Sequence, residues 1–155
     1  MHNNGKVLQQ LFAAVNAHDH AAIAACYHSD AVFRDIAFDL HGAREIHAMW
    51  HMICSGDLTA TVHTLEADGD KGRAQVTDEY TFSETGRKVC NPIESSFRFR
   101  DGLIIEHCDE CDPRNWAAMA LGGVSGFVAG RFEFVRRWKA RKKLARFVDE
   151  HPEYR

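Results

Sequence analysis

The feature that most constrains the fold is a series of long strand-like segments in the second half of the chain. Residues 73–83 alternate between apolar and polar side chains, which predicts a β-strand with one buried face. The segments with strand character are 59–66, 73–83, 89–100 and 103–112. Turn signals such as Asp101-Gly102 separate them. The pattern predicts an antiparallel meander.

Helical patterns precede these strands. Apolar residues recur at helical spacing over 5–18, and Asp19 is a suitable N-cap for a second, short helix. The segment 31–36 has strand composition, and Gly42 then precedes a third helix whose apolar stripe includes Trp50. Three helices followed by a meander predict an α+β fold, with the helices packed on one face of a curved sheet.

The C-terminal part of the chain differs in charge. Residues 1–130 hold ten Lys and Arg against eighteen Asp and Glu, whereas residues 131–150 hold eight against three. The acidic body argues against binding to nucleic acid. We expect a domain over 1–116 and an extension over 117–155, formed by a Gly/Ala segment and a basic helix. Packing on the body or on a second subunit is the favoured role of that helix, and contact with an anionic membrane surface is the alternative.

Cysteine and histidine spacing gives no strong signal for a metal or a disulfide. The five cysteines are irregularly spaced, so no disulfide framework is expected. Cys108 and Cys111, like His47 and His51, have a metal-ligand spacing but lack further ligands. We therefore expect no metal and no cofactor, with both histidines on a solvent-facing flank. Neither a signal peptide nor a spanning helix is evident, which predicts a cytoplasmic protein.

Asp78 interrupts the apolar face of its predicted strand. It shares that face with Val76 and Tyr80. A carboxylate there must be paired, hydrogen-bonded or protonated, because an isolated buried charge is costly. Burial raises the pKa of a carboxyl group and so makes it a proton donor near neutral pH. A structural carboxyl group satisfied by a neighbouring side chain or amide is the alternative.

Two other segments carry candidate aspartates. On the last predicted strand His107, Asp109 and Cys111 share one face, although alternation does not say whether it points inward. Asp35 shares a face with Phe33 on the first strand. His107 could bond to a pocket group or pair with a nearby glutamate, and both interpretations stay open.

Three stretches resemble the NTF2-like superfamily, and its SnoaL-like polyketide cyclase branch in particular. They are residues 27–35 (YHSDAVFRD), His41-Gly42 at the start of a helix, and residues 101–109 (DGLIIEHCD). The likeness covers about residues 5–116. It implies a cone-shaped fold with an interior pocket and a homodimer formed through the sheet.

The resemblance also implies which residues act. Asp35 matches the general base of ketosteroid isomerase, while Asp78 and Asp109 match the catalytic aspartates of limonene-epoxide hydrolase. SnoaL-like cyclases place an acid/base aspartate at about Asp109. Other functional positions of these relatives hold residues of different chemistry here: Leu11, Phe33, Val76 and Ser95. No relative's complete catalytic set is present.

Together these patterns predict an acid–base enzyme of isomerase, cyclase or epoxide-hydrolase type, acting on a small apolar or polycyclic molecule. A non-catalytic module for hydrophobic ligands and a dimeric interaction domain are the alternatives. The expected catalytic residues are Asp35, Asp78 and Asp109. The expected pocket lining is Phe33, Trp50, Val76, Tyr80, Ser95, Phe97, His107, Cys111 and Trp116.

Overall fold

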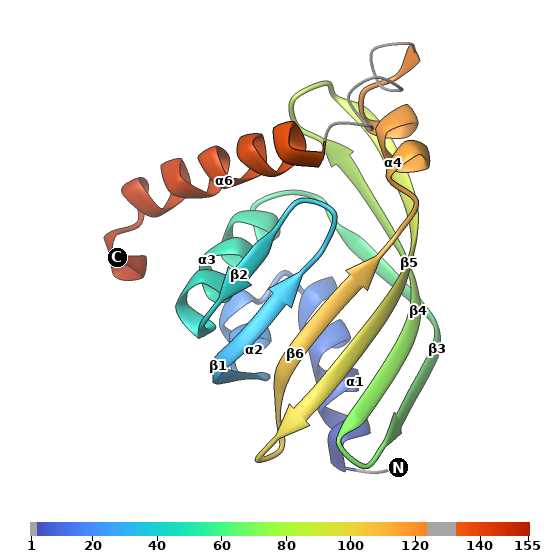
Figure 1. Ribbon diagram of the computed structural model, residues 1–155, viewed down its shortest axis with the longest axis vertical. Helices are drawn as coiled ribbons and strands as arrows, with labels where there is room; N and C mark the ends of the chain where they lie inside the picture. The colour runs from blue at the N-terminus through green and yellow to red at the C-terminus, as the bar shows by residue number, and fades with distance from the viewer. Residues whose placement is uncertain (1–2, 124–132) are drawn as a thin grey trace.

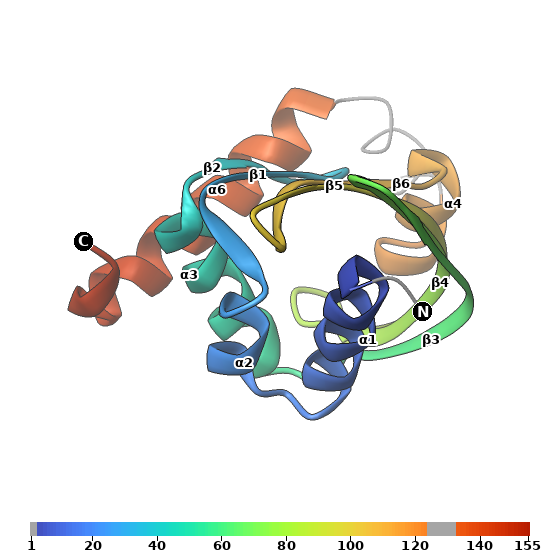
Figure 2. The ribbon, with the colours of Figure 1, turned by 90° about the horizontal axis from the view of Figure 1, so that it is seen from below.

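A curved six-stranded sheet wraps around the N-terminal helices (Figure 1, Figure 2). The computed structural model describes residues 3–123 and 133–155. The helices are α1 (Asn3–Asn16), α2 (His20–Ala24), α3 (Ala43–Cys54), α4 (Pro113–Ala120) and α6 (Glu133–Glu150), and a short 3-10 turn, η1 (Pro152–Tyr154), follows. The strands are β1 (Tyr27–Arg34), β2 (Asp39–His41), β3 (Thr59–Asp68), β4 (Lys71–Phe82), β5 (Arg87–Arg100) and β6 (Leu103–Glu110). The predicted α+β class is confirmed.

Strands β3 to β6 form the predicted antiparallel meander. The order across the sheet is β2-β1-β6-β5-β4-β3. The register places Asp78 on β4 opposite Asn91 on β5, and Ser95 on β5 opposite Asp109 on β6. Paired residues of an antiparallel sheet face the same side, so these four side chains share the inner face with the helices.

Strand β1 joins the meander by parallel pairing, which the sequence did not predict. Phe33 on β1 lies beside His107 on β6. The short strand β2 completes a hairpin with β1. This arrangement places β1 between β2 and β6 and brings its side chains next to those of β6.

Helix α4 replaces the end of the last predicted strand. Strand β6 ends at Glu110 rather than Asp112, because the Asp112 side chain accepts hydrogen bonds from the backbone amides of Arg114 and Asn115. Pro113 occupies the first turn, where its missing amide hydrogen costs nothing. Trp116 therefore lies on a helix.

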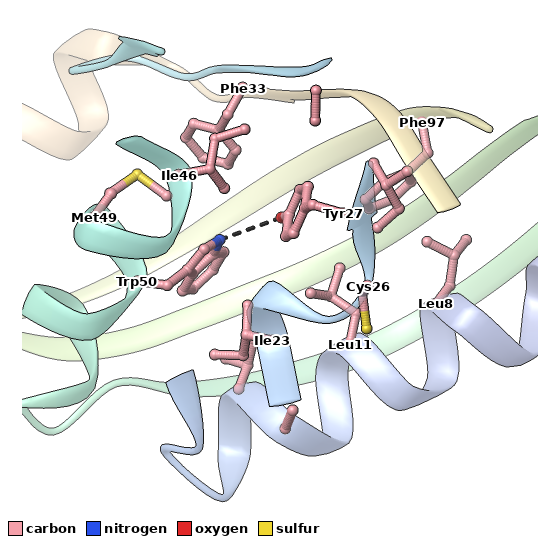
Figure 3. Packing of buried hydrophobic residues seen from close by; sticks show 14 of the residues in the cluster. Leu8, Leu11, Ile23, Cys26, Tyr27, Phe33, Ile46, Met49, Trp50 and Phe97 are labelled. Atoms are coloured by element: carbon pink, nitrogen blue, oxygen red, sulfur yellow. Dashed lines mark hydrogen bonds between the residues drawn. The ribbon is translucent and has the colours of Figure 1, made fainter. Parts of the chain in front are cut away.

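The core fills the space between the helices and the inner sheet face (Figure 3). Leu8 and Leu11 on α1 are fully buried, as are Ile46 and Met49 on α3. Their helical spacing places each pair on one side of its helix. Asp19 accepts a hydrogen bond from the Ala22 amide, so the predicted N-cap of α2 is confirmed.

In Figure 1, helix α6 begins beside the upper ends of β4 and β5 and runs above the β1–β2 hairpin and α3. Arg136 Nε donates to the Ile36 carbonyl at 2.8 Å, and Lys143 Nζ donates to Ser83 Oγ at 2.7 Å. Leu144 is buried in the main core. The helix is thus held by the β1–β2 loop, by the turn after β4 and by apolar packing.

Four histidines lie where the end of the chain packs against α2 and α3. We call them the histidine cluster: His20, His47, His51 and His151. The ring of His20 stacks on that of His51 at 3.7 Å, and His20 Nδ1 lies 2.9 Å from His47 Nε2. His51 Nδ1 lies 2.9 Å from the Tyr154 hydroxyl. The expectation of a solvent-facing flank for His47 and His51 is therefore wrong, because the C-terminus covers them.

The division of the chain at residue 116 stays a prediction. Residues 124–132 of the expected Gly/Ala segment and basic helix lie outside the described residues. No helix within 3–123 or 133–155 is long and apolar enough to cross a lipid bilayer.

Candidate active site

A cavity of about 20 Å³ lies between α1 and the inner face of the sheet. Its polar lining is Asp78, Ser95, His107 and Asp109. Its apolar lining is Leu11, Phe12, Val15, Trp50, Leu58, Ala60, Val76 and Ile93. The volume suits about one water molecule, so a larger ligand requires side chains of the lining to move.

Asp109 is held by two hydrogen bonds to the same oxygen. Ser95 Oγ donates to Oδ1 at 2.6 Å, and His107 Nε2 lies 2.8 Å from that atom. The side chain of Asp109 is 16% exposed and that of His107 only 3%. Both hydrogen bonds end on Oδ1. No described residue bonds to Oδ2, so this atom is available to a water molecule or a ligand.

A chain of hydrogen bonds fixes the orientation of His107. The Tyr27 hydroxyl lies 2.7 Å from His107 Nδ1 and accepts a hydrogen bond from Trp50 Nε1 at 3.2 Å (Figure 3). A carboxylate only accepts hydrogen bonds, so the imidazole proton belongs on Nε2, facing Asp109. Nδ1 then accepts from Tyr27. We call Trp50, Tyr27, His107, Asp109 and Ser95 the Asp109 network.

Aromatic rings enclose His107. The Phe97 ring lies 4.4 Å from it, and the Phe33 ring meets it edge-on at 4.8 Å. Phe33 also packs edge-on against Trp50. These two predicted pocket residues therefore shield the His107 ring from water and restrict its rotation.

Asp78 also lines the cavity, but its hydrogen bonding differs from that of Asp109. Its carboxyl group has no hydrogen-bond partner among the residues that the structure describes, which contrasts with Asp109. Burial raises its pKa to about 7, and the negative charges of Asp109 and Asp35 act in the same direction. An isolated buried carboxyl group is stable when protonated. Asp78 is thus suited to donate a proton near neutral pH.

Asp35 lies just beyond β1 and outside the cavity lining. Its Oδ1 accepts hydrogen bonds from the backbone amides of Ala37 and Phe38 at 2.8 and 2.6 Å, which shape the β1–β2 loop. Burial raises its pKa to about 6, although these amides and His107 oppose the shift and Asp109 adds to it. The structure brings Asp35 within electrostatic range of the site and gives one of its oxygens a role in the loop.

The remaining predicted pocket residues lie nearer to α4. Trp116 Nε1 donates to the Tyr80 hydroxyl at 2.7 Å, and burial raises the pKa of Tyr80 to about 12. Burial likewise raises the pKa of the Cys111 thiol, whereas a hydrogen bond from Asn91 lowers it. Among the described residues, no group of three His, Cys, Asp or Glu side chains is placed to hold a metal ion.

A larger hollow of about 680 Å³ lies along the sheet and is mostly lined by exposed residues, such as Gln75, Pro92 and Glu94. Its lining also includes Asn91 and Cys111. We place the candidate site in the smaller cavity, because the paired aspartates and the bonded histidine converge there.

Sequence reasoning missed two residues of this region. Tyr27 orients His107, yet the two are 80 positions apart and meet only through the parallel pairing of β1 with β6. Asn91 lies opposite Asp78, and the alternation of β5 with Ser95 and Phe97 placed it on the inner face. That alternation was the one signal that could have identified it.

Comparison with known proteins identifies the family to which this fold belongs. Residues 8–107 match the SnoaL-like domain family. The chain belongs to the SnoaL-like family. The predicted resemblance to the NTF2-like superfamily is therefore confirmed. No curated protein matches this SnoaL-like chain.

Several solved structures share the SnoaL-like fold. An LEH-like epoxide hydrolase from M. tuberculosis is 19% identical, covers 82% of this chain and 96% of its own, and has a TM-score of 0.68. TsrD from Streptomyces laurentii is 23% identical, with 76% and 94% covered and a TM-score of 0.66. A protein of ketosteroid isomerase-like fold from Catenulispora acidiphila, in complex with trimethylamine, is 14% identical, with 77% and 95% covered and a TM-score of 0.68. At these identities the likeness shows the fold alone.

Proposed function

We propose that this SnoaL-like protein is an acid–base enzyme that adds water to a small, largely apolar electrophile such as an epoxide. The observation that carries the proposal is the contrast between two aspartates of one cavity. Asp109 is bonded as a carboxylate by Ser95 and His107, whereas Asp78 has a pKa raised to about 7 by burial. One group can accept a proton while the other donates one.

The reaction follows from these two roles. Asp109 Oδ2 removes a proton from a water molecule, and the water oxygen forms a bond to an epoxide carbon. The epoxide C–O bond breaks, and the Asp78 proton passes to the released oxygen. The product is a vicinal diol. Return of the proton from Asp109 to Asp78 restores the starting state.

The cavity lining favours a substrate with more apolar than polar surface. Eight apolar residues and four polar ones surround it. Phe12 on α1 is only half-buried, so its side chain can move more readily than those of the fully buried core. A small terpene-like or cyclic epoxide suits such a lining better than a charged molecule, which would lose its hydration.

The test is turnover of cyclohexene oxide and limonene epoxide, with diol formation measured by gas chromatography. Asp78→Asn and Asp109→Asn should each lower kcat by about 100-fold or more. Glu79→Gln and Glu110→Gln are matched controls, since each adjoins one aspartate on the exposed face of the same strand. Wild-type rates in both aspartate variants would refute the proposal.

A non-catalytic module for hydrophobic ligands is the second candidate. Val76 in place of the arginine that bridges the aspartates of limonene-epoxide hydrolase favours it. Under this alternative, a ligand would protect the protein against thermal unfolding without being consumed. Diol formation by the wild type that is lost in Asp109→Asn decides against it.

The expected partners fit the same proposal. We propose a homodimer through the outer face of the sheet, where the large hollow offers a surface for a second copy. The basic helix α6 already packs on the body, so contact with a membrane stays the less favoured role. A cytoplasmic location also stays a prediction.

A further inference from the structure

We propose that Asn91 Oδ1 is a ligand-binding atom and that the ligand of this site carries a hydrogen-bond donor, a hydroxyl or N–H group, beside its apolar part. The inference deepens the proposed function and rests on it insofar as Asp78 is the acid next to the bound ligand. It adds a residue and a substrate class that the two aspartates do not supply.

The position of Asn91 carries the first step. The β4–β5 register sets Asn91 directly opposite Asp78 on the inner face of the sheet. Cross-strand neighbours have their Cβ atoms about 5 Å apart. Asp78 and Ile93, the next inward residue along β5, both line the small cavity. Asn91 itself lines the larger hollow, and it adjoins the small cavity through its neighbours Asp78 and Ile93.

The hydrogen bonding of Asn91 carries the second step. The residue is only 3% exposed, and its Oδ1 is buried without a hydrogen-bond partner in the described part of the chain. Its side-chain amide also interacts with the Cys111 thiol and lowers the pKa of that group. Buried acceptors are almost always satisfied, so an oxygen left open next to the site indicates a partner supplied from outside.

Two other buried polar residues of the inner face give the contrast. Ser95 donates to Asp109, and both ring nitrogens of His107 lie within hydrogen-bond distance of a partner. Both are as deeply buried as Asn91. Among these three residues, the buried atom without a partner is an acceptor, and an acceptor binds a hydrogen-bond donor. A site that binds a hydroxyl group binds the analogue without it more weakly, so epoxides that lack a donor should be weaker ligands than hydroxylated ones.

The experiment uses a matched pair of unreactive probes, cyclohexanol and methoxycyclohexane, which differ in the donor. Their binding to the full chain is measured by nuclear magnetic resonance titration of the backbone amides, which the wild type and Asn91→Leu both retain. The wild type should bind cyclohexanol at least about tenfold more tightly. Asn91→Leu should bind the two probes equally.

A stability measurement separates this role from a structural one. Asn16 makes two hydrogen bonds to Ala60, as donor to its carbonyl and as acceptor from its amide. Asn16→Leu should therefore lower the melting temperature clearly. Asn91→Leu should leave it unchanged or raise it, because the variant removes an unsatisfied polar atom.

The outcomes are distinct. Loss of stability in Asn91→Leu equal to that of Asn16→Leu would overturn the inference, as would unchanged discrimination in Asn91→Leu. A wild type that binds neither probe, or binds both equally, overturns it too. Discriminating binding without any epoxide turnover would refute only the proposed function and leave the role of Asn91 standing.

Discussion

The Asp109 network and the histidine cluster both place imidazole rings against tyrosine hydroxyl groups, yet their surroundings differ. The network contains one histidine, which is buried, enclosed by aromatic rings and hydrogen-bonded through both nitrogens. The cluster contains four, of which His47 and His51 are half-buried and lie under the C-terminal turn. The first fixes one proton arrangement, while the second joins two parts of the chain.

The comparison shows that the role of a histidine in this protein depends on how deeply its ring is buried. A deeply buried imidazole with two fixed partners orients a carboxylate and holds its own tautomer. Imidazole rings stacked near solvent respond to pH, because protonation of two neighbours creates repulsion. We therefore expect chemistry to depend on the network and attachment of α6 to depend on the cluster.

The largest expected effect separates the two regions by activity. Asp109→Asn should reduce diol formation by about 100-fold to 10,000-fold, because it removes the base. His51→Asn should leave kcat within about threefold of the wild type, because it lies outside the network. Initial rates at substrate saturation measure both. Equal losses of kcat in the two variants would contradict the separate roles of the Asp109 network and the histidine cluster.

The next effect concerns stability and the raised pKa of Asp78. The folded protein keeps the proton of Asp78 up to a pKa of about 7, whereas the unfolded chain loses it near 3.8. The contribution of the Asp78 side chain to the free energy of unfolding is therefore largest below about pH 3.8. This contribution is lost as the pH rises towards 7. Asp78→Asn should exceed the wild type in unfolding free energy by on the order of 2–4 kcal/mol at about pH 8.

Urea unfolding at several pH values between about 4.5 and 8 measures this effect. The advantage of Asp78→Asn should shrink as the pH falls. Glu79→Gln, on the exposed face of β4, should show no such trend. The same ionisation should lower kcat as the pH rises through about 7, since the acid is then deprotonated. A stability difference that does not vary with pH would contradict the role of burial.

A smaller effect tests the far end of the Asp109 network. Tyr27→Phe removes the hydroxyl that joins Trp50 to His107 and leaves both buried groups without that partner. The loss of stability should be about 1–3 kcal/mol. Turnover should fall by about tenfold, with KM nearly unchanged, because Tyr27 positions the base through His107. Tyr154→Phe is the matched control at the other region, and it should not alter kcat.

The smallest effect belongs to the histidine cluster and pH. Burial and the neighbouring His20 lower the pKa of both His47 and His51, His151 adds to the shift of His51, and Glu153 opposes it in both. Since their pKa lies below the ordinary 6.5, the stability that they contribute is present above 6.5 and is lost as the pH falls below it. The C-terminal helix should loosen there first.

Hydrogen exchange of the α6 amides at about pH 7.5 and 5.5 checks this expectation. Among the described residues, Glu153 is the carboxylate whose charge acts on both His47 and His51, and Arg44 donates to the Arg155 carbonyl at the end of the chain. His20→Gln should reduce the pH dependence by removing one repulsive partner. Faster exchange in β5 than in α6 at low pH would contradict a local effect.

Much of the fold was predictable from alternation. The period of two over residues 73–83 and the turn at Asp101-Gly102 gave the meander and its inner face, and Asp78 was placed there correctly. The parallel contact of β1 with β6 was not predictable, because no local pattern specifies which distant strand completes a sheet. Without it, the hydrogen bond between Tyr27 and His107 could not be foreseen.

The candidate site was predictable to a lesser degree. Alternation left the facing of His107 open, and its pairing with the inward-facing Phe97 shows that it points inward. Asp35 was expected to be catalytic together with Asp78 and Asp109, yet its Oδ1 accepts hydrogen bonds from the amides of its own loop. The histidine cluster was not predicted, because His51 contacts His151 and Tyr154 from the opposite end of the chain.

Strand β5 limits how this protein can change in length. Along its 14 residues, buried and exposed side chains alternate, with Asn91 and Ser95 among the buried ones. One inserted codon in the middle would reverse the facing of every residue on one side of it and send charges into the core. The turns at Gly86 and Gly102 have no such constraint. Libraries that vary length should therefore place their insertions at these turns and only substitutions within β5.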